Sequence, residues 1–138
     1  MIYCCFHATG KTTLSRKNSR FIDLDIPYLG VDEIVNLALE NQSIGKIPLL
    51  PMWGILRQEL NKRQIKYKII YPDISLKEEY INRINKRNKS SELEESLQEH
   101  WDILINGFKQ SETESIVLKS KQYLEDIFNH EHDHFVSR

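Results

Sequence analysis

The chain has 138 residues, of which 40% are hydrophobic and 28% are charged. This length and composition are typical of one soluble globular domain and exclude a long disordered or fibrous chain. Its 19 basic and 20 acidic side chains give a net charge of -1. No overall positive field therefore points to nucleic acid or to an anionic membrane surface, and binding to either would have to be local.

The two cysteines, Cys4 and Cys5, are adjacent in the sequence. Neighbouring side chains on a strand point to opposite faces, so a disulfide between them is not expected. The N-terminus lacks the basic and apolar segments of a secretion signal, and no apolar run reaches the roughly 18 residues of a membrane span. We therefore expect a reduced, cytoplasmic protein without a membrane-spanning segment.

Hydrophobic periodicity predicts strands and helices that alternate along the chain. In order, the pattern predicts a strand at 1–6, a helix at 10–18, a strand at 20–25, a helix at 31–42, a strand at 45–51, a helix at 52–64 and a strand at 65–72. It then predicts helices at 76–88 and 93–109, a strand at 115–119, a helix at 122–129 and a polar tail at 130–138.

Two local signals bear on these elements. Ser75 with Glu78, and Ser91 with Glu94, have the spacing of capping boxes that begin the two helices after the fourth strand. Pro48 is awkward in a central strand, because proline has no N–H to donate to a neighbour.

Strands that alternate with helices favour a parallel sheet covered on both faces. We therefore predict an α/β fold, a three-layer sandwich with a mostly parallel five-stranded sheet. A single domain would span 1–129, followed by the tail. In such sheets ligands bind at the carboxyl ends of the strands.

The stretch from Cys5 to Thr12 matches a phosphate-binding loop, G-x-x-x-x-G-K-[ST], except that Cys5 stands at the first glycine. Backbone N–H groups of such a loop converge on phosphate oxygens, the lysine reaches the β- and γ-phosphates, and the next hydroxyl binds Mg²⁺. The predicted nucleotide-binding residues are His7, Ala8, Thr9, Gly10, Lys11, Thr12 and Thr13. The alternative is an ordinary helix start that Thr9 caps, with Lys11 in solvent.

Asp23 and Asp25 lie two residues apart at the end of the second predicted strand. Their side chains therefore share a face and lie near the phosphate-binding loop. The alternative is that these carboxylates only mark a turn.

Arg83 and Arg87 are four residues apart on one predicted helix and project from one face, with Lys77 and Lys86 nearby. A helical lid around 75–90 could close these arginines over a triphosphate and stabilise charge on the transferred phosphoryl group. The alternative is a solvated basic face in which Glu79 pairs with Arg83.

The last residues and the tryptophans carry weaker signals. His130, His132 and His134 alternate with acidic residues, a pattern for which we favour a disordered polar tail over a metal site. Trp53 and Trp101 lie on apolar helix faces and are expected in the core.

The chain resembles the small P-loop kinases of the nucleotide and shikimate kinase type, most of all short phage and bacterial proteins described as P-loop NTPases or as adenylate-kinase-like. The resemblance covers most of the chain and rests on ATGKTTL with FIDLD, on LRQELNKRQIKYKIIYPDISLKEEYINRINKR, and on HWDILI with VLKSKQYLEDIF. It implies a P-loop NTPase-like fold, a site for ATP and Mg²⁺, and a small-molecule acceptor. In such kinases an aspartate at this place binds the magnesium shell or takes the proton of the attacking hydroxyl. This implies that Asp23 binds metal with Thr12 and that Asp25 is catalytic.

The chain departs from these kinases at Cys5, in the short segment 26–45 where they carry a larger acceptor-binding insert, and at 46–51, which lacks a magnesium-binding aspartate. Our leading hypothesis is an ATP-dependent phosphotransferase of nucleoside or nucleotide kinase type. Its catalytic residues are Lys11, Asp25, Arg83 and Arg87. The alternative is a non-catalytic module that binds a nucleotide or a host protein, for example a phage factor that sequesters a nucleotide. A purely structural domain would have no affinity for nucleotides.

Overall fold

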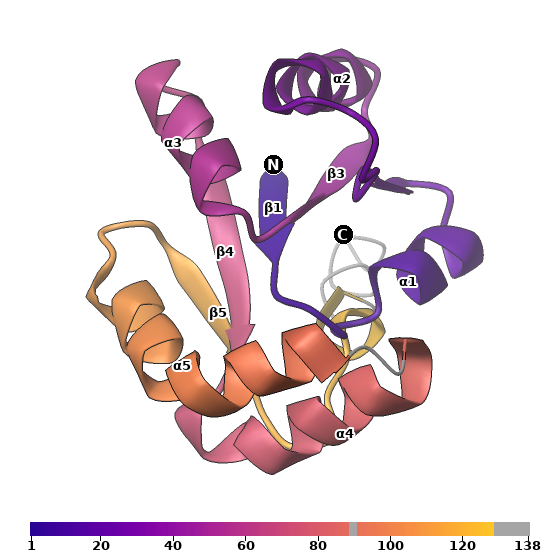
Figure 1. The fold of residues 1–138 in the computed structure, drawn as a ribbon. Coiled ribbons are helices and arrows are strands. Elements are labelled where there is room, and N and C mark those ends of the chain that lie inside the picture. The colour runs from indigo at the N-terminus through magenta and orange to yellow at the C-terminus, as the bar shows by residue number, and fades with distance from the viewer. Residues whose placement is uncertain (89–90, 129–138) are drawn as a thin grey trace.

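Five short strands form one parallel sheet at the centre of the protein (Figure 1). The computed structural model describes residues 1–88 and 91–128. The strands are β1 (Ile2–Cys5), β2 (Phe21–Asp23), β3 (Ile47–Pro51), β4 (Tyr67–Pro72) and β5 (Ser115–Leu118). They lie in the order β2-β3-β1-β4-β5, and every neighbouring pair is parallel. The predicted α/β fold with a five-stranded sheet is confirmed, and the sheet is wholly parallel.

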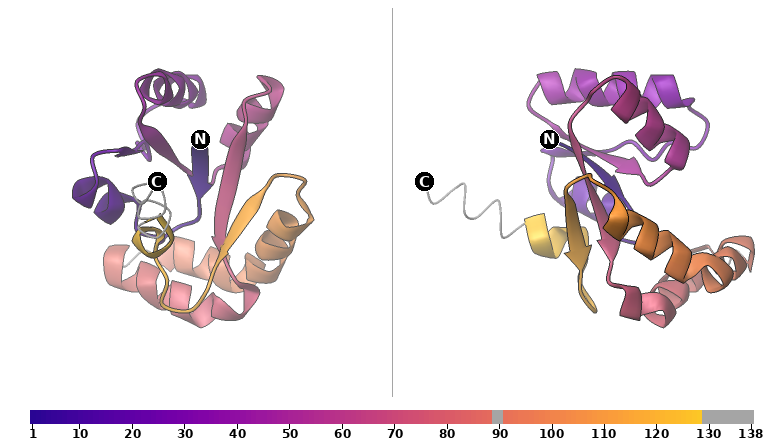
Figure 2. Two further views of the ribbon diagram at one scale, coloured as in Figure 1. Left: turned by 180° about the vertical axis from the view of Figure 1, so that it is seen from behind. Right: turned by 90° about the vertical axis from the view of Figure 1, so that its left-hand side faces the viewer.

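Helices cover both faces of this sheet (Figure 2). They are α1 (Lys11–Lys17), α2 (Val31–Ser43), α3 (Gly54–Lys62), the 3₁₀ turn η1 (Ile74–Leu76), α4 (Lys77–Asn88) and α5 (Ser91–Gln110), and residues 124–128 are also helical. Apolar side chains of α2, α3, α4 and α5 form the larger core on one face. Those of α1 and 124–128 form a smaller core on the other. This arrangement agrees with the predicted three layers.

The central strand β1 contributes to both cores. Ile2 and Cys4 belong to the larger core, whereas Tyr3 and Cys5 belong to the smaller one. A strand buried on both faces has a continuous apolar sequence rather than an alternating one, which is the pattern of MIYCCF. Both cysteines are free thiols.

Proline is tolerated in β3 although this strand lies inside the sheet. The N–H of Ile47 donates to Arg20, and the carbonyl of Leu49 accepts from Leu24, so both residues direct their backbone groups toward β2. The ring nitrogen of Pro48 therefore faces the β1 side, one residue before the pairing of Tyr3 with Leu49 begins. Its missing donor falls at the end of a ladder, where the loss is small.

The start of α4 differs from the prediction. Ser75 does not form a capping box with Glu78; its hydroxyl and its backbone N–H both donate to the carboxylate of Asp73, at 2.6 and 3.0 Å. Asp73 thereby begins the turn η1, which leads directly into α4. An aspartate accepts from backbone N–H groups as well as serine does, so it competes for the same role.

Other expectations lie outside the described residues. The polar tail at 130–138, with His130, His132 and His134, belongs to this group, as does the capping side chain of Ser91.

Trp101 is buried in the larger core as expected, and Trp53 packs against that core. Within 1–88 and 91–128, none of the helices has the length and apolar character needed to cross a membrane.

The order of the strands defines where a ligand can bind. From β1 the chain continues to β2 on one side of the sheet, whereas from the adjacent β4 it continues to β5 on the other. In open parallel sheets the connections diverge at such a point and leave a crevice beyond the carboxyl ends of the strands. A ligand site is therefore expected beside the loops that follow β1 and β4.

Candidate functional site

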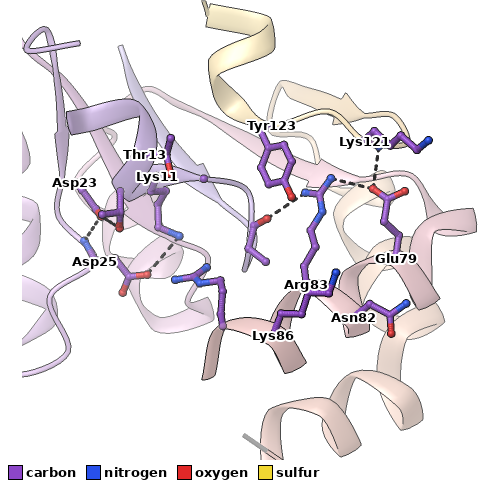
Figure 3. Close-up of a pocket in the computed structure, with 14 residues that line it drawn as sticks. Lys11, Thr13, Asp23, Asp25, Glu79, Asn82, Arg83, Lys86, Lys121 and Tyr123 are labelled. Carbon is purple, nitrogen blue, oxygen red and sulfur yellow. Dashed lines mark hydrogen bonds and ion pairs between the residues drawn. The ribbon is translucent and has the colours of Figure 1, made fainter. Parts of the chain in front are cut away.

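A cleft of about 780 Å³ opens at the carboxyl ends of the strands (Figure 3). Its lining comes from the loop after β1 with the start of α1, from the end of β2, from α4, and from the loop after β5. The lining residues are Ala8, Gly10, Lys11, Thr12, Thr13, Asp23, Asp25, Glu79, Asn82, Arg83, Lys86, Arg87, Lys121 and Tyr123. The cleft thus occupies the position at which parallel sheets bind ligands.

The loop between β1 and α1 turns through two left-handed residues. Ala8 has a φ of 58° and Gly10 a φ of 95°. Cys5, at the first glycine position of the motif, belongs to β1 and does not have a positive φ. The turn therefore does not require glycine at Cys5, because its left-handed positions come later in the loop.

Thr9 faces the interior and does not cap α1. Its side chain is fully buried, and its hydroxyl donates to the carbonyl of Phe6 at 2.9 Å. Gly10 is the N-cap residue of α1, and among the described residues no side-chain cap hydrogen bond forms at this end. The alternative of an ordinary helix start capped by Thr9 is therefore wrong.

Lys11 lies in the cleft rather than in solvent. Only 9% of its side chain is exposed, and its Nζ lies 3.3 Å from Oδ2 of Asp25 (Figure 3). A lysine this buried is normally paired, and Asp25 is its partner. The two residues that the sequence predicts to be catalytic at the loop and at the end of β2 thus meet.

Thr12 and Asp23 form a second pair beside the first. The hydroxyl of Thr12 donates to Oδ2 of Asp23 at 3.0 Å, and the N–H of Asp25 donates to Oδ1 of Asp23 at 3.0 Å. The second hydrogen bond fixes the turn after β2, so part of the alternative is correct: Asp23 also marks a turn. Asp25 has a different role, because its carboxylate projects into the cleft.

Arg83 is held by contacts within the protein. Its guanidinium donates to the carbonyl of Ala8 at 3.1 Å and to that of Gln122 at 3.1 Å, and it pairs with Glu79 at 2.9 Å. It also lies between two aromatic rings, 4.4 Å from the centroid of Tyr80 and 3.9 Å from that of Tyr123. Arg83 thus joins α4 to the loop between β1 and α1 and to the loop after β5.

Glu79 fastens the loop after β5 to α4. Its carboxylate accepts from the hydroxyl of Ser120 at 2.6 Å and from the backbone N–H of Lys121 at 2.9 Å, in addition to Arg83. Partial burial by itself would raise the pKa of Glu79, but the hydrogen bonds from Ser120 and Lys121, with the charge of Arg83, lower this pKa overall. The carboxylate is therefore held in its charged form.

Three cations of the cleft have no carboxylate partner among residues 1–88 and 91–128. Lys86 and Arg87 are exposed residues of α4, and Lys121 is exposed in the loop after β5. Within the part of the chain that the structure describes, none of the three forms an ion pair. Their charges are therefore available to an anionic ligand.

His7 lies beside the cleft without lining it. The ring is partly buried and packs edge-on against Phe6. Burial, together with the charge of Lys11, lowers the pKa of His7 below its ordinary value of 6.5. The imidazole is therefore neutral at pH 7.

Most predicted site residues meet in the cleft, and some that sequence reasoning missed join them. His7 and Thr9 do not line it, whereas all the other predicted binding and catalytic residues do. Tyr123 and Lys121 were missed, because the loop after β5 has no recognisable motif. The two loops nevertheless approach closely, since a Cβ on Gly10 would lie 3.3 Å from Tyr123 Cδ1.

No protein-family model matches the chain, and no curated protein is significantly similar to it.

Among the described residues, no group of three or more His, Cys, Asp or Glu side chains is arranged to hold a metal ion. A cation at Thr12 and Asp23 would need further oxygen ligands, such as those of phosphates and water. Any functional conclusion therefore depends on the cleft itself.

Proposed function

We propose that the chain binds ATP with Mg²⁺ in this cleft and transfers the γ-phosphoryl group to a small acceptor, as a kinase of the nucleoside or nucleotide type. The observation that carries the proposal is that Lys11 pairs with Asp25, and Thr12 with Asp23, in one cleft at the carboxyl edge of a parallel sheet. Phosphoryl transfer uses a lysine, a hydroxyl and carboxylates in this combination.

The size and charge of the cleft suit a nucleoside triphosphate. Its volume of about 780 Å³ lies within the roughly 300–1,000 Å³ of small-molecule sites. Lys11 and the three cations without a carboxylate partner, Lys86, Arg87 and Lys121, complement a polyphosphate. Arg83 supports this arrangement by holding the loop, since its guanidinium donates to Ala8, Glu79 and Gln122 within the protein.

Thr12 and Asp23 are the residues that would hold Mg²⁺. A hydroxyl and a carboxylate oxygen within 3.0 Å of each other fit a hard cation that keeps water and phosphate oxygens among its ligands. The bound cation would neutralise charge on the β- and γ-phosphates.

Asp25 is placed to act on the acceptor. Its carboxylate takes the proton of an acceptor hydroxyl; the acceptor oxygen forms a bond to the γ-phosphorus, and the bond from that phosphorus to the departing ADP oxygen breaks. Lys11, which lies between the loop and Asp25, and Arg87 stabilise the charge on the transferred group. Catalysis of this kind depends mainly on position and charge.

The experiment that tests the proposal is titration of the purified chain with ATP and Mg²⁺ by calorimetry. We expect saturable binding that Lys11→Met abolishes. The matched control is Lys62→Met, at an exposed lysine at the end of α3, outside the cleft. Absence of binding to the unmodified chain would overturn the proposal.

A further inference from the structure

The charge of Lys11 is paired within the protein. Only 9% of its side chain is exposed, and its Nζ lies 3.3 Å from Oδ2 of Asp25 (Figure 3). Among residues 1–88 and 91–128, Asp25 is the only ion-pair partner of Lys11. A carboxylate oxygen therefore lies beside the ammonium group that the proposed function assigns to the phosphates.

The two carboxylates at the end of β2 are held to different degrees. Asp23 accepts from the hydroxyl of Thr12 and from the backbone N–H of Asp25, both at 3.0 Å. Within the part of the chain that the structure describes, the carboxylate of Asp25 has no hydrogen-bond or ion-pair partner except Lys11. Asp25 is thus the more weakly held of the two, and loss of a single contact releases it.

Release of Asp25 needs no change in the backbone. The N–H of Leu24 donates to the carbonyl of Leu49, and the N–H of Ile26 donates to that of Leu24, both at 2.9 Å. These hydrogen bonds fix the turn after β2 without the carboxylate of Asp25. Since 38% of this side chain is exposed, rotation about its own bonds can carry the carboxylate away from Lys11.

A phosphate oxygen and Asp25 compete for the same ammonium group. Both are anions, and Lys11 is too deeply buried to offer a second one much free surface. Lys86, Arg87 and Lys121 also line the cleft, but they are exposed and form no ion pair among the described residues. A polyphosphate meets these three cations without displacing a carboxylate, whereas it gains Lys11 only by exchange.

We propose that Asp25 is an internal competitor of the nucleotide: its carboxylate takes the place of a phosphate oxygen at Lys11 until the phosphates of MgATP displace it. The inference rests on the proposed function and concerns the same cleft. The competition lowers the affinity for the nucleotide, because only the arrangement with Lys11 released is competent to bind phosphate. The exchange also frees Asp25, so the base of the proposed reaction becomes available once the phosphoryl group is in place.

The first test measures binding of MgATP by calorimetry to the unmodified full chain and to Asp25→Asn, which keeps the size of the side chain without its charge. Removal of the competitor should tighten binding at least about threefold. Magnesium tripolyphosphate, which has no nucleoside, should gain by a similar factor, because the exchange concerns phosphate alone. The matched control is Asp32→Asn, which removes an exposed carboxylate outside the cleft and should change the affinity less than about 1.5-fold.

The second test is a crystal structure of the chain with Mg²⁺ and a non-hydrolysable ATP analogue. We expect phosphate oxygens in contact with Lys11. The distance from its Nζ to Oδ2 of Asp25 should then exceed the roughly 4 Å of an ion pair. This measurement separates a broken contact from a general effect of the negative charge on Asp25.

Three results overturn the inference and leave the proposed function in place. Asp25→Asn may bind MgATP no more tightly than the unmodified chain, or the ion pair of Lys11 with Asp25 may persist beside the bound phosphates. A gain for MgATP that tripolyphosphate does not share is the third, because it assigns the effect to the nucleoside. Absence of MgATP binding to the unmodified chain instead overturns the proposed function.

Discussion

The guanidinium of Arg83 donates a hydrogen bond to the carbonyl of Ala8 across 3.1 Å, although the two residues are 75 positions apart in the chain. Ala8 is one of the two left-handed residues of the loop between β1 and α1. The same guanidinium bonds to Gln122 in the loop after β5. One largely buried cation thus connects three of the four segments that line the cleft, and we expect both stability and binding to depend on these contacts.

The first prediction separates two arginines on one helix. Arg83→Met removes the donor to the carbonyls of Ala8 and Gln122 and one of the three donors to Glu79, so we expect the free energy of unfolding to fall by about 3 kcal/mol. Arg87→Met removes an exposed side chain. We expect it to change the free energy of unfolding by less than about 0.5 kcal/mol while weakening MgATP binding. Urea denaturation and calorimetry measure the two effects. Equal losses of stability in both variants would contradict the structural role of Arg83.

The second prediction concerns Asp25. Asp25→Asn keeps the size of the side chain but cannot take a proton, so we expect turnover with an acceptor to fall by about 10²- to 10⁴-fold. MgATP should still bind. Asp32→Asn changes an exposed carboxylate outside the cleft and is the control. Unchanged turnover in Asp25→Asn would exclude Asp25 as the base, whereas a non-catalytic nucleotide-binding module would give no turnover in any of these proteins.

The third prediction compares three glycines. Gly10→Ala places a Cβ in a left-handed conformation and 3.3 Å from Tyr123, and we expect a loss of about 2 kcal/mol with weaker MgATP binding. Gly45→Ala has the conformational strain without a close contact and should lose about 1 kcal/mol with no effect on binding. Gly54 begins α3 without a positive φ, so Gly54→Ala should be stabilising by about 0.5 kcal/mol. Thermal denaturation with and without MgATP gives all the values, and equal behaviour of the Gly10 and Gly45 variants would refute the contact with Tyr123.

The fourth prediction follows from the lowered pKa of Glu79. A carboxyl whose pKa is lower in the folded chain than its ordinary 4.5 contributes stability that is complete above this value and is lost as the pH falls through the folded pKa. The stability difference between the unmodified chain and Glu79→Gln should therefore be constant near neutral pH and shrink below about pH 4.5. Chemical denaturation at several pH values measures it. Glu78→Gln, at the exposed neighbour that has none of these hydrogen bonds, is the matched control. A stability difference between the unmodified chain and Glu79→Gln that grows as the pH falls would contradict the lowered pKa of Glu79.

The sheet and its helices could be predicted because their signals are local. The continuous apolar run of β1 and the helical spacing of α5 are visible in a few residues each, and burial in the structure follows those patterns. The beginning of α4 could not be predicted as well, since Asp73 and Ser75 are both able to cap and only the turn η1 decides between them.

The candidate site was predictable where one segment carries the motif. Gly10, Lys11 and Thr12 lie in one such segment. The position of Asp23 and Asp25 at the end of the next strand predicted that they lie near it, but not that Lys11 pairs with Asp25. The helical spacing of Arg83 and Arg87 predicted that both project from one face of α4, and both line the cleft. It did not predict that Arg83 contacts Tyr123 and Gln122. Those contacts join α4 to the loop after β5, and no pattern within either segment encodes the approach.

Cys4 and Cys5, adjacent on β1, are buried in different cores of the sandwich. Burial raises the pKa of both thiols, that of Cys5 to about 12, so neither reacts while the layers stay closed. A thiol reagent can reach Cys4 when the layer of α2 to α5 detaches, and Cys5 when α1 and residues 124–128 do. Each thiol therefore reports on one side of the sheet. Comparing the labelling rates of Cys4 and Cys5 shows whether the two helical layers come apart together or independently.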